Sequence, residues 1–335
     1  MSKLNVLYQF NEKYAPFAGV SITSLFENNK PYNEIDVYIL GENLSDDSIN
    51  RLEKLAKKYT RKIIFKETDS LISLMKEWGI PSYRGSYAAN MRLFLPMILS
   101  EEVDRILYLD ADTVVNNSIQ DLYQIDLKDK ALAMALDSLG TKHKNRIGLL
   151  ENEPYYNSGV ILFDLDNWKT YRCSERIVEH IQKTKIVYPS PDQDLLNLVC
   201  KGQIMQLMPE WNYQPVHIAY MAKQYFRWYK DTSYYNIEQI EKAKDKVKIY
   251  HFFRFLGEFP WNKGNLHPDN DIFDQYLKMS PWNEYKKQPS DCGIANKIEK
   301  ILYKILPRGV FLGVFSIFHN LYIEGKNEVI SEQEK

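Results

Sequence analysis

The sequence predicts an α/β fold in which a Rossmann-like, mostly parallel mixed sheet is covered by helices on both faces and followed by a helical C-terminal extension. Strand-like and helix-like segments alternate from residue 4 onward, which implies right-handed crossovers between parallel strands. The run "RILYLDADTV", residues 105–114, begins as an apolar strand and then carries two acids. From about residue 265 the chain becomes helical, basic and aromatic. We therefore expect a main domain over residues 1–264 and an extension over residues 265–335.

Short apolar runs mark the predicted strands. They cover residues 4–10, 35–40, 62–65, 103–110, 131–137, 155–165 and 249–252. Pro16 suits a first helical turn, because the N–H that it lacks would have no intrahelical partner there. Ser45 is a predicted N-cap of a second helix, and Pro191 opens a third. A further helix is expected over residues 85–95, ending before Pro96.

Composition and charge limit the kinds of partner. Hydrophobic residues make up 44% of the 335 residues, which is enough to bury a core, and the formal net charge is −1. No overall charge would therefore draw the chain to nucleic acid. The three cysteines form no CxxC pair, the N-terminal residues lack a long apolar signal region, and no apolar run reaches the roughly 18 residues of a membrane span. We expect a protein of a reducing, cytoplasmic compartment.

The two acids in the strand-like run are Asp110 and Asp112. If the chain stays extended to residue 112, both carboxylates project to one side. Adjacent unpaired carboxylates raise each other's pKa, and a divalent cation between them removes that cost. Oxygen ligands suit Mg²⁺ or Mn²⁺, which commonly also hold substrate phosphates. A strand end followed by a turn that Asp112 caps is the alternative interpretation.

Three other segments bring polar residues to predicted element ends. Asn157, Ser158 and Gly159 lie at the start of a buried run, where glycine permits close approach of another group. Residues 191–197 (PDQDLLN) begin a helix with acids and an amide, and His251 follows an apolar strand. Each has a structural alternative: a turn at a strand start, a capped helix, or a packed histidine. Since ligands of open α/β sheets bind beyond the carboxyl ends of strands, a shared site is the functional interpretation.

These segments together resemble the family 8 retaining glycosyltransferases, which include glycogenin and bacterial lipopolysaccharide galactosyl- and glucosyltransferases. The resemblance runs from about residue 4 to about residue 262. Its pieces occur in the family's order and are Tyr14-Ala15-Pro16, Arg92 in "NMRLFL", "YLDAD" (108–112), "NSGV" (157–160), "DQD" (192–194), and His251 followed by Pro260-Trp261. The resemblance implies a nucleotide-sugar-binding domain of the GT-A type.

The resemblance also implies roles for individual residues. Asp110, Asp112 and His251 would bind Mn²⁺ or Mg²⁺, which holds the UDP diphosphate. Asp137, Asp192 and Gln193 would act at the reacting sugar, with Gln193 near the anomeric carbon. The implied donor site comprises Gln9, Asn11, Tyr14, Arg92, Asp110, Ala111, Asp112, Asn157, Ser158, Gly159, Asp192, Gln193, Gly257 and Lys263. The implied reaction moves galactose or glucose from a UDP-sugar to a glycan, glycolipid or glycoprotein with retention.

The chain departs from the family pattern in two places. Asn11 stands where the family usually has Asp, and Lys13 stands where it usually has Asn. The late motif is longer than usual, and Phe259 occupies the position of a phosphate-binding lysine. Arg254 and Lys263 are the candidate replacements.

Two other kinds of protein are compatible with part of the sequence. The changed late motif motivates a non-catalytic module that binds nucleotide-sugars or glycans. The predicted sheet alone would also suit a dinucleotide oxidoreductase, but no GxGxxG fingerprint follows the first strand. Metal-dependent UDP release would distinguish the enzyme from the binding module.

The C-terminal extension contains an amphipathic segment. In residues 294–306, isoleucines and leucines recur at helical spacing while lysines project elsewhere, and the apolar run 309–322 follows Pro307. One interpretation is packing onto the main domain or a second subunit. The other is a peripheral membrane contact through residues 291–323 at an anionic inner leaflet. On the second interpretation, truncation before residue 290 should release the chain from vesicles without loss of donor hydrolysis.

Overall fold

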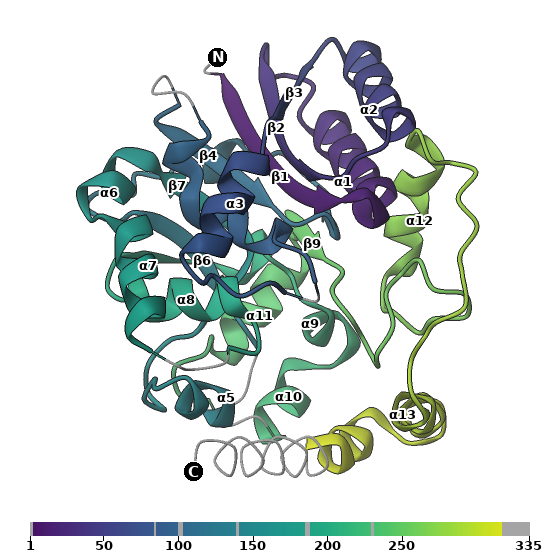
Figure 1. The fold of residues 1–335 in the computed structure, drawn as a ribbon. Helices are drawn as coiled ribbons and strands as arrows, with labels where there is room; N and C mark the ends of the chain where they lie inside the picture. Colours follow the sequence, from purple (N-terminus) through teal and green to yellow (C-terminus); the bar gives the residue numbers. More distant parts are fainter. Residues whose placement is uncertain are drawn as a thin grey trace.

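A seven-stranded sheet forms the centre of the molecule (Figure 1). The structure is a computed structural model that describes residues 3–83, 85–99, 103–138, 141–184, 188–228 and 231–316. The strand order is β3-β2-β1-β4-β7-β6-β8. The strands are β1 (Leu4–Asn11), β2 (Ile35–Glu42), β3 (Lys62–Lys66), β4 (Arg105–Leu109), β6 (Leu132–Leu136), β7 (Tyr156–Asp164) and β8 (Ile204–Leu207). The prediction of a mostly parallel mixed sheet is confirmed.

The direction of the strands changes at β7. β3, β2, β1 and β4 run parallel, as do β6 and β8, but β7 lies antiparallel between β4 and β6. Strand β8 was not predicted from the sequence. A separate two-stranded ladder was not predicted either; in it, β5 (Thr113–Val115) pairs antiparallel with β9 (Ile249–His251).

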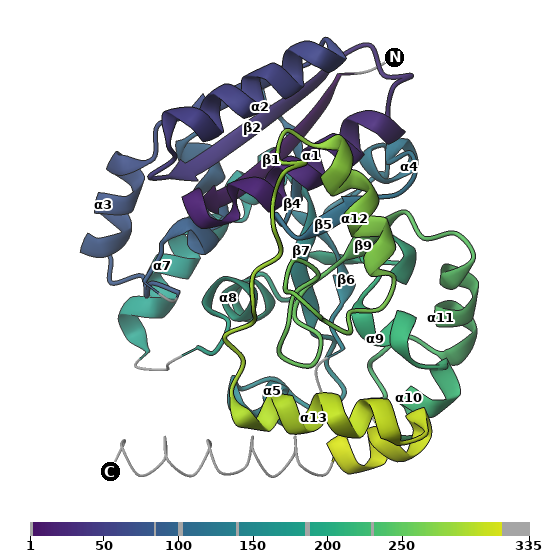
Figure 2. The ribbon, with the colours of Figure 1, turned by 90° about the vertical axis from the view of Figure 1, so that its right-hand side faces the viewer.

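Helices cover both faces of the sheet (Figures 1 and 2). The α-helices are α1 (Ala15–Asn28), α2 (Asp46–Tyr59), α3 (Asp69–Glu77), α4 (Gln120–Tyr123), α5 (Thr141–Arg146), α6 (Leu165–Thr170), α7 (Cys173–Lys183), α8 (Pro191–Val199), α9 (Pro215–Ala219), α10 (Ala222–Trp228), α11 (Ile237–Lys244), α12 (Asn270–Met279) and α13 (Ile294–Ile305). Short 3-10 helices are η1 (Glu12–Tyr14), η2 (Ala88–Met97) and η3 (Pro209–Trp211). Alternating strand residues divide between two hydrophobic clusters: Val6 and Tyr8 of β1 face the cluster with α1, and Leu7 faces the cluster with η2 and α8.

The predicted helix starts are confirmed. Pro16 lies in the first turn of α1, and Pro191 is the first residue of α8. The Ser45 side chain accepts a hydrogen bond from the backbone N–H of Ser48, which satisfies one of the unpaired donors at the start of α2.

A helix is present near the expected residues 85–95, but the prediction of its bounds is wrong. Residues 88–97 form the 3-10 helix η2, which includes Pro96 and is interrupted by non-helical angles at Phe94. The angles at Phe94 divide η2 into two shorter pieces, as expected from the rarity of long 3-10 helices. The irregular backbone still buries Arg92, which the site uses.

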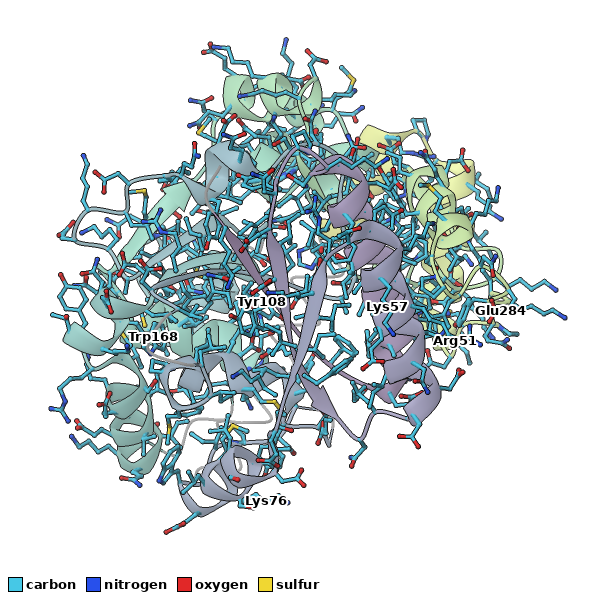
Figure 3. All side chains as sticks on the ribbon, turned by 90° about the horizontal axis from the view of Figure 1, so that it is seen from above. Arg51, Lys57, Lys76, Tyr108, Trp168 and Glu284 are labelled. Atoms are coloured by element: carbon cyan, nitrogen blue, oxygen red, sulfur yellow. The ribbon has the colours of Figure 1, made fainter. Side chains whose placement is uncertain are left out.

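The residues after 265 pack against the main domain. Phe273 of α12 lies in the same cluster as Phe17 of α1 and Trp261. Arg51 of α2 pairs with Glu284, and the two side chains are labelled next to each other in Figure 3. Arg51 also donates to the carbonyl of Pro281 at 2.6 Å. The boundary at residue 264 stays a prediction, and α12 belongs physically to the core of the preceding residues.

Helix α13 lies along one end of the molecule (Figure 2). Its Tyr303 is buried with Tyr220 and Phe255 of the main domain and with Phe311 beyond Pro307. The part of the apolar run 309–322 beyond residue 316 lies outside the described residues. Within the described ranges, no helix combines the length and apolar character needed to cross a bilayer.

Candidate active site

Two strand ends and a turn bring the predicted metal ligands together. β4 ends at Leu109, and the chain then turns at Ala111 and Asp112, with the backbone N–H of Thr113 donating to the carbonyl of Asp110 at 3.1 Å. The chain therefore does not stay extended to residue 112, and a turn follows the strand end, as in the alternative interpretation. The turn starts β5, whose Thr113 is directly paired with His251 of β9. The ladder thus places the histidine beside both carboxylates.

The side chains of these three residues converge on one point. The His251 Nε2 atom lies 3.2 Å from Asp112 Oδ1 and 3.6 Å from Asp110 Oδ2. Burial alone would lower the pKa of His251, but the carboxylates of Asp112 and Asp110 outweigh it and raise the pKa above 6.5. One ligand atom from each residue lies within 4.8 Å of the others. Two carboxylate oxygens and one imidazole nitrogen are a donor set that suits Mn²⁺ and Mg²⁺.

Gly159 of β7 makes room for this histidine. A Cβ atom at Gly159 would lie 2.0 Å from His251 Cε1 and 2.6 Å from His251 Nδ1. The imidazole of His251 therefore occupies the space that a side chain at residue 159 would need. The backbone carbonyl of Gly159 also accepts from the backbone N–H of Asp110 at 2.8 Å. Gly159 therefore contacts both the histidine and the first aspartate of the metal-ligand group.

Arg92 links the metal-ligand group to α8. Its Nη2 donates to Asp110 Oδ1 at 3.1 Å, its Nη1 donates to the carbonyl of Ser158 at 2.6 Å, and its Nε lies 3.6 Å from Asp192 Oδ2. The guanidinium stacks on the Tyr108 ring at 3.8 Å. Burial raises the pKa of Asp192, and the charge of Arg92 opposes that rise. The buried positive charge thus sits between two acids at the edge of the sheet.

A second group of polar side chains lies next to Arg92. The Asn157 Nδ2 and Gln193 Nε2 atoms donate to Asp137 Oδ2 at 2.6 and 3.2 Å. Gln193 Oε1 accepts from the backbone N–H of Ser158 at 2.9 Å, and the Ser158 hydroxyl donates to Asp192 Oδ2 at 3.1 Å. The predicted residues of β7, of α8 and of the end of β6 are therefore one hydrogen-bonded network.

The end of β1 holds buried acceptors. Gln9 Nε2 donates to the carbonyl of Ala89 at 2.7 Å, while Gln9 Oε1 and Asn11 Oδ1 are buried acceptors without a hydrogen-bond partner among the described residues. β1 is the parallel neighbour of β4, so its carboxyl end lies at the same edge as Asp110. Tyr14 packs edge-on against Trp261 at 6.1 Å. Unsatisfied buried acceptors are costly unless a ligand supplies donors, as the N–H and hydroxyl groups of a nucleoside would.

The predicted residues of the late motif, Gly257 and Lys263, contact the C-terminal extension. Gly257 has φ of +79°, and a Cβ there would lie 2.5 Å from Asn296 of α13. The Lys263 backbone N–H donates to the carbonyl of Gln288 at 2.7 Å. Phe259 stacks on Trp261 with ring centres 4.4 Å apart, and the Arg254 guanidinium lies 5.0 Å from the centre of the Phe259 ring. This loop is therefore held by the C-terminal extension.

Several residues of the site were not predicted from the sequence. Asn212 bridges His251 and Asn157, and the Tyr155 hydroxyl joins Gln193 to Asp194. Asp194 also accepts from the backbone N–H of Ser190 at the start of α8. Asp194 was visible in "DQD", but a lone asparagine in "PEWNYQP" carries no spacing signal.

The fold and the site define a class: an α/β protein with a polar site that includes potential metal ligands beyond the carboxyl ends of its parallel strands. The chain matches the model of Glycosyl transferase family 8 over residues 5–264, and it belongs to this family. It is thus a glycosyltransferase by family.

The chain is also similar to named proteins and to a solved structure. A lipopolysaccharide 1,2-glucosyltransferase of Escherichia coli (strain K12) is 30% identical over 288 residues, which is 84% of this chain and 79% of the relative. General stress protein A of Bacillus subtilis (strain 168) is 27% identical over 278 residues, covering 82% and 92%. The galactosyltransferase LgtC, solved with donor and acceptor sugar analogs, has a TM-score of 0.68 at 23% identity, covering 83% of this chain and 96% of that one. The fold is of the GT-A type.

Proposed function

We propose that this chain transfers galactose or glucose from a UDP-sugar to a hydroxyl of a glycan, glycolipid or glycoprotein, with retention and with the help of a divalent metal. The observation that carries the proposal is the convergence of Asp110, Asp112 and His251 beside the Arg92 and Gln193 network. The named lipopolysaccharide glucosyltransferase relative supports a glycolipid acceptor.

The residues of the site suit the loss of a diphosphate leaving group. Mn²⁺ or Mg²⁺ held by Asp110, Asp112 and His251 would neutralise the negative charge that develops on UDP. The guanidinium of Arg92, which Asp110 and Asp192 hold in place, would add a second positive charge near that leaving group. Asp137 and Asp192 offer carboxylate oxygens to sugar hydroxyls, which orients the anomeric carbon.

The hydrogen bonds of Gln193 favour attack by the acceptor on the face from which UDP leaves. Gln193 Oε1 already accepts from the backbone N–H of Ser158 at 2.9 Å. Its Nε2 donates to Asp137 and Tyr155. A neutral amide oxygen that already accepts a hydrogen bond is a poor nucleophile, so a double displacement through Gln193 would first have to break this network.

A non-catalytic module that binds nucleotide-sugars is the second candidate. Phe259 stands in place of the phosphate lysine, and the nearby cation, Arg254, lies over its ring. Binding does not require that lysine's charge, whereas departure of a diphosphate benefits from it.

A panel of UDP-sugars separates the two candidates. We expect one UDP-hexose to give Mn²⁺-dependent UDP release, and chelation of the metal to abolish it.

We also expect Mn²⁺ and UDP together to raise the melting temperature more than the sum of their separate shifts, because the metal would bridge the carboxylates and the diphosphate. Cooperative binding without UDP release across the panel would favour the binding module. Strictly additive shifts would argue against a shared metal and diphosphate site.

We further propose that α13 places the enzyme at the anionic inner face of the cytoplasmic membrane. Ile294, Ile298, Ile301 and Ile305 form an exposed stripe on the face of α13 opposite Tyr303. Lys297 and Lys304 are exposed beside it. An apolar stripe flanked by lysines combines insertion at the interface with attraction to anionic lipids.

Substitution of the stripe tests this contact better than truncation. Truncation before residue 290 would remove Lys300, which pairs with buried Glu258 at 2.6 Å, and it would uncover Phe255. We therefore expect truncation to lower stability as well. Ile298→Glu with Ile301→Glu should reduce co-sedimentation with phosphatidylglycerol vesicles at least about tenfold, since each change removes apolar contact and adds repulsion.

The matched control is Lys242→Glu, a change of an exposed lysine on α11, which should leave vesicle binding unchanged. Added salt should weaken binding of the native chain. A native chain that ignores anionic vesicles at low salt, or a dimer that the isoleucine substitutions dissociate, would show that protein covers the stripe.

A further inference from the structure

Asn212 occupies a central position between two parts of the site. It follows η3, is fully buried at 0% exposure, and contacts side chains from two different strands. Its Nδ2 lies 2.8 Å from Asn157 Oδ1, and its Oδ1 lies 2.9 Å from His251 Nδ1. One amide therefore connects the metal-ligand group with the residues that would hold sugar hydroxyls.

The direction of these hydrogen bonds is set by the backbone. The N–H of Gly159, which can only donate, points at Asn157 Oδ1 at 2.9 Å, and Asn157 Nδ2 faces the Asp137 carboxylate at 2.6 Å. Asn157 Oδ1 must therefore be an acceptor. The atom of Asn212 that meets it must be the amide nitrogen, which leaves the amide oxygen of Asn212 facing His251.

The orientation of Asn212 in turn selects the histidine tautomer. Because an amide oxygen can only accept, His251 Nδ1 must carry a proton. The lone pair of the neutral ring then lies on Nε2, the atom that faces Asp112 and Asp110 at 3.2 and 3.6 Å. Partners of this kind orient a metal-binding histidine and strengthen its affinity for the metal.

We propose that Asn212 is a positioning residue that holds His251 with Nε2 toward the metal and couples this ligand to Asn157 and Asp137 at the donor sugar. The inference rests on the proposed function for the identity of the two sites. It predicts that the two hydrogen bonds of the Asn212 amide can be removed separately. The amide oxygen accepts from the metal ligand His251, and the amide nitrogen donates to Asn157 at the sugar site.

Three variants test the role of Asn212. Asn212→Leu removes both hydrogen bonds, so Mn²⁺ affinity measured by calorimetry without donor should fall about 10- to 100-fold. Asn212→Asp keeps an acceptor for His251 Nδ1 and should keep Mn²⁺ affinity within about threefold. Its second oxygen opposes Asn157 Oδ1, so it should lose the extra affinity of UDP-hexose over UDP. Asn29→Leu is the matched control, because Asn29 is equally buried and bonded but lies at the end of α1.

The control should lower the melting temperature without changing Mn²⁺ affinity. Equal Mn²⁺ affinity in Asn212→Leu and the native chain would overturn the proposal, as would an Asn212→Asp variant that retains full preference for UDP-hexose. The imidazole ¹⁵N shifts of His251 at alkaline pH give a readout that needs no metal. If the native chain binds no Mn²⁺, the metal part of the proposed function fails, whereas a proton on Nδ1 that Asn212→Leu displaces still supports the positioning role. If the proton stays on Nδ1 of His251 in Asn212→Leu, the positioning role is refuted.

Discussion

Replacing Asp112 with asparagine should abolish Mn²⁺-dependent UDP release while the protein remains folded. The carboxylate of Asp112 lies 3.2 Å from His251 Nε2, in a turn outside the main sheet, and the backbone carbonyl of Asp112 keeps its bond from the N–H of Phe252. The substitution removes one of two acidic ligands but preserves shape. We expect turnover to fall by about 10²- to 10³-fold or more, as when one strong electrostatic contact to the transition state is lost.

Asp110 provides an instructive comparison. Its carboxylate also accepts from Arg92 and from the Tyr108 hydroxyl, so Asp110→Asn weakens the pairing of a buried guanidinium. We expect that variant to lose stability as well as activity. Asp166→Asn is the surface control, because this carboxylate is 75% exposed and pairs weakly with Lys169 at 3.9 Å. Near-normal UDP release by a normally folded Asp112→Asn variant would refute the metal site.

Much of the fold could be predicted because local signals and burial agree. β1, β2 and β3 are apolar runs that the structure finds within two residues of the expected bounds. Ser45 caps α2 through a local hydrogen bond, so its role is readable from a few neighbouring residues. The antiparallel direction of β7 was not readable, because direction depends on the path of the chain between distant strands.

The residues of the candidate site could be predicted from the sequence better than their arrangement in space. Asp110 and Asp112 were found from an acidic pattern after an apolar run, and their convergence was expected from extended backbone. The structure uses a turn and the long-range pairing of β5 with β9 instead. Asn212 shows the same limit, since its role comes from contacts 39 and 55 residues away along the chain. Such pairing is fixed by tertiary packing, which a short motif does not encode.

Gly159→Ala should remove metal binding through the addition of one methyl group. The new Cβ would overlap the His251 ring, with 2.0 Å to Cε1 and 2.8 Å to Nε2. The ring has little freedom to yield, because β9 fixes its backbone opposite Thr113 and Asn212 holds its Nδ1. We expect Mn²⁺ affinity, followed by electron paramagnetic resonance, to fall at least about 100-fold, and stability to fall by about 1–3 kcal/mol from overpacking.

Two further variants show whether displacement of His251 is the cause. Gly293→Ala is the matched control, since a Cβ there has open space and φ is −68°, so Mn²⁺ affinity should be unchanged. In the double variant Gly159→Ala with His251→Ala, the methyl group no longer meets a ring. The two changes should therefore be strongly non-additive: the double variant should bind Mn²⁺ no more weakly than His251→Ala alone and should regain stability relative to Gly159→Ala. A Gly159→Ala chain that binds Mn²⁺ like the native protein would mean that the imidazole at this position is not a ligand, because the ring cannot keep its place once the methyl group is present.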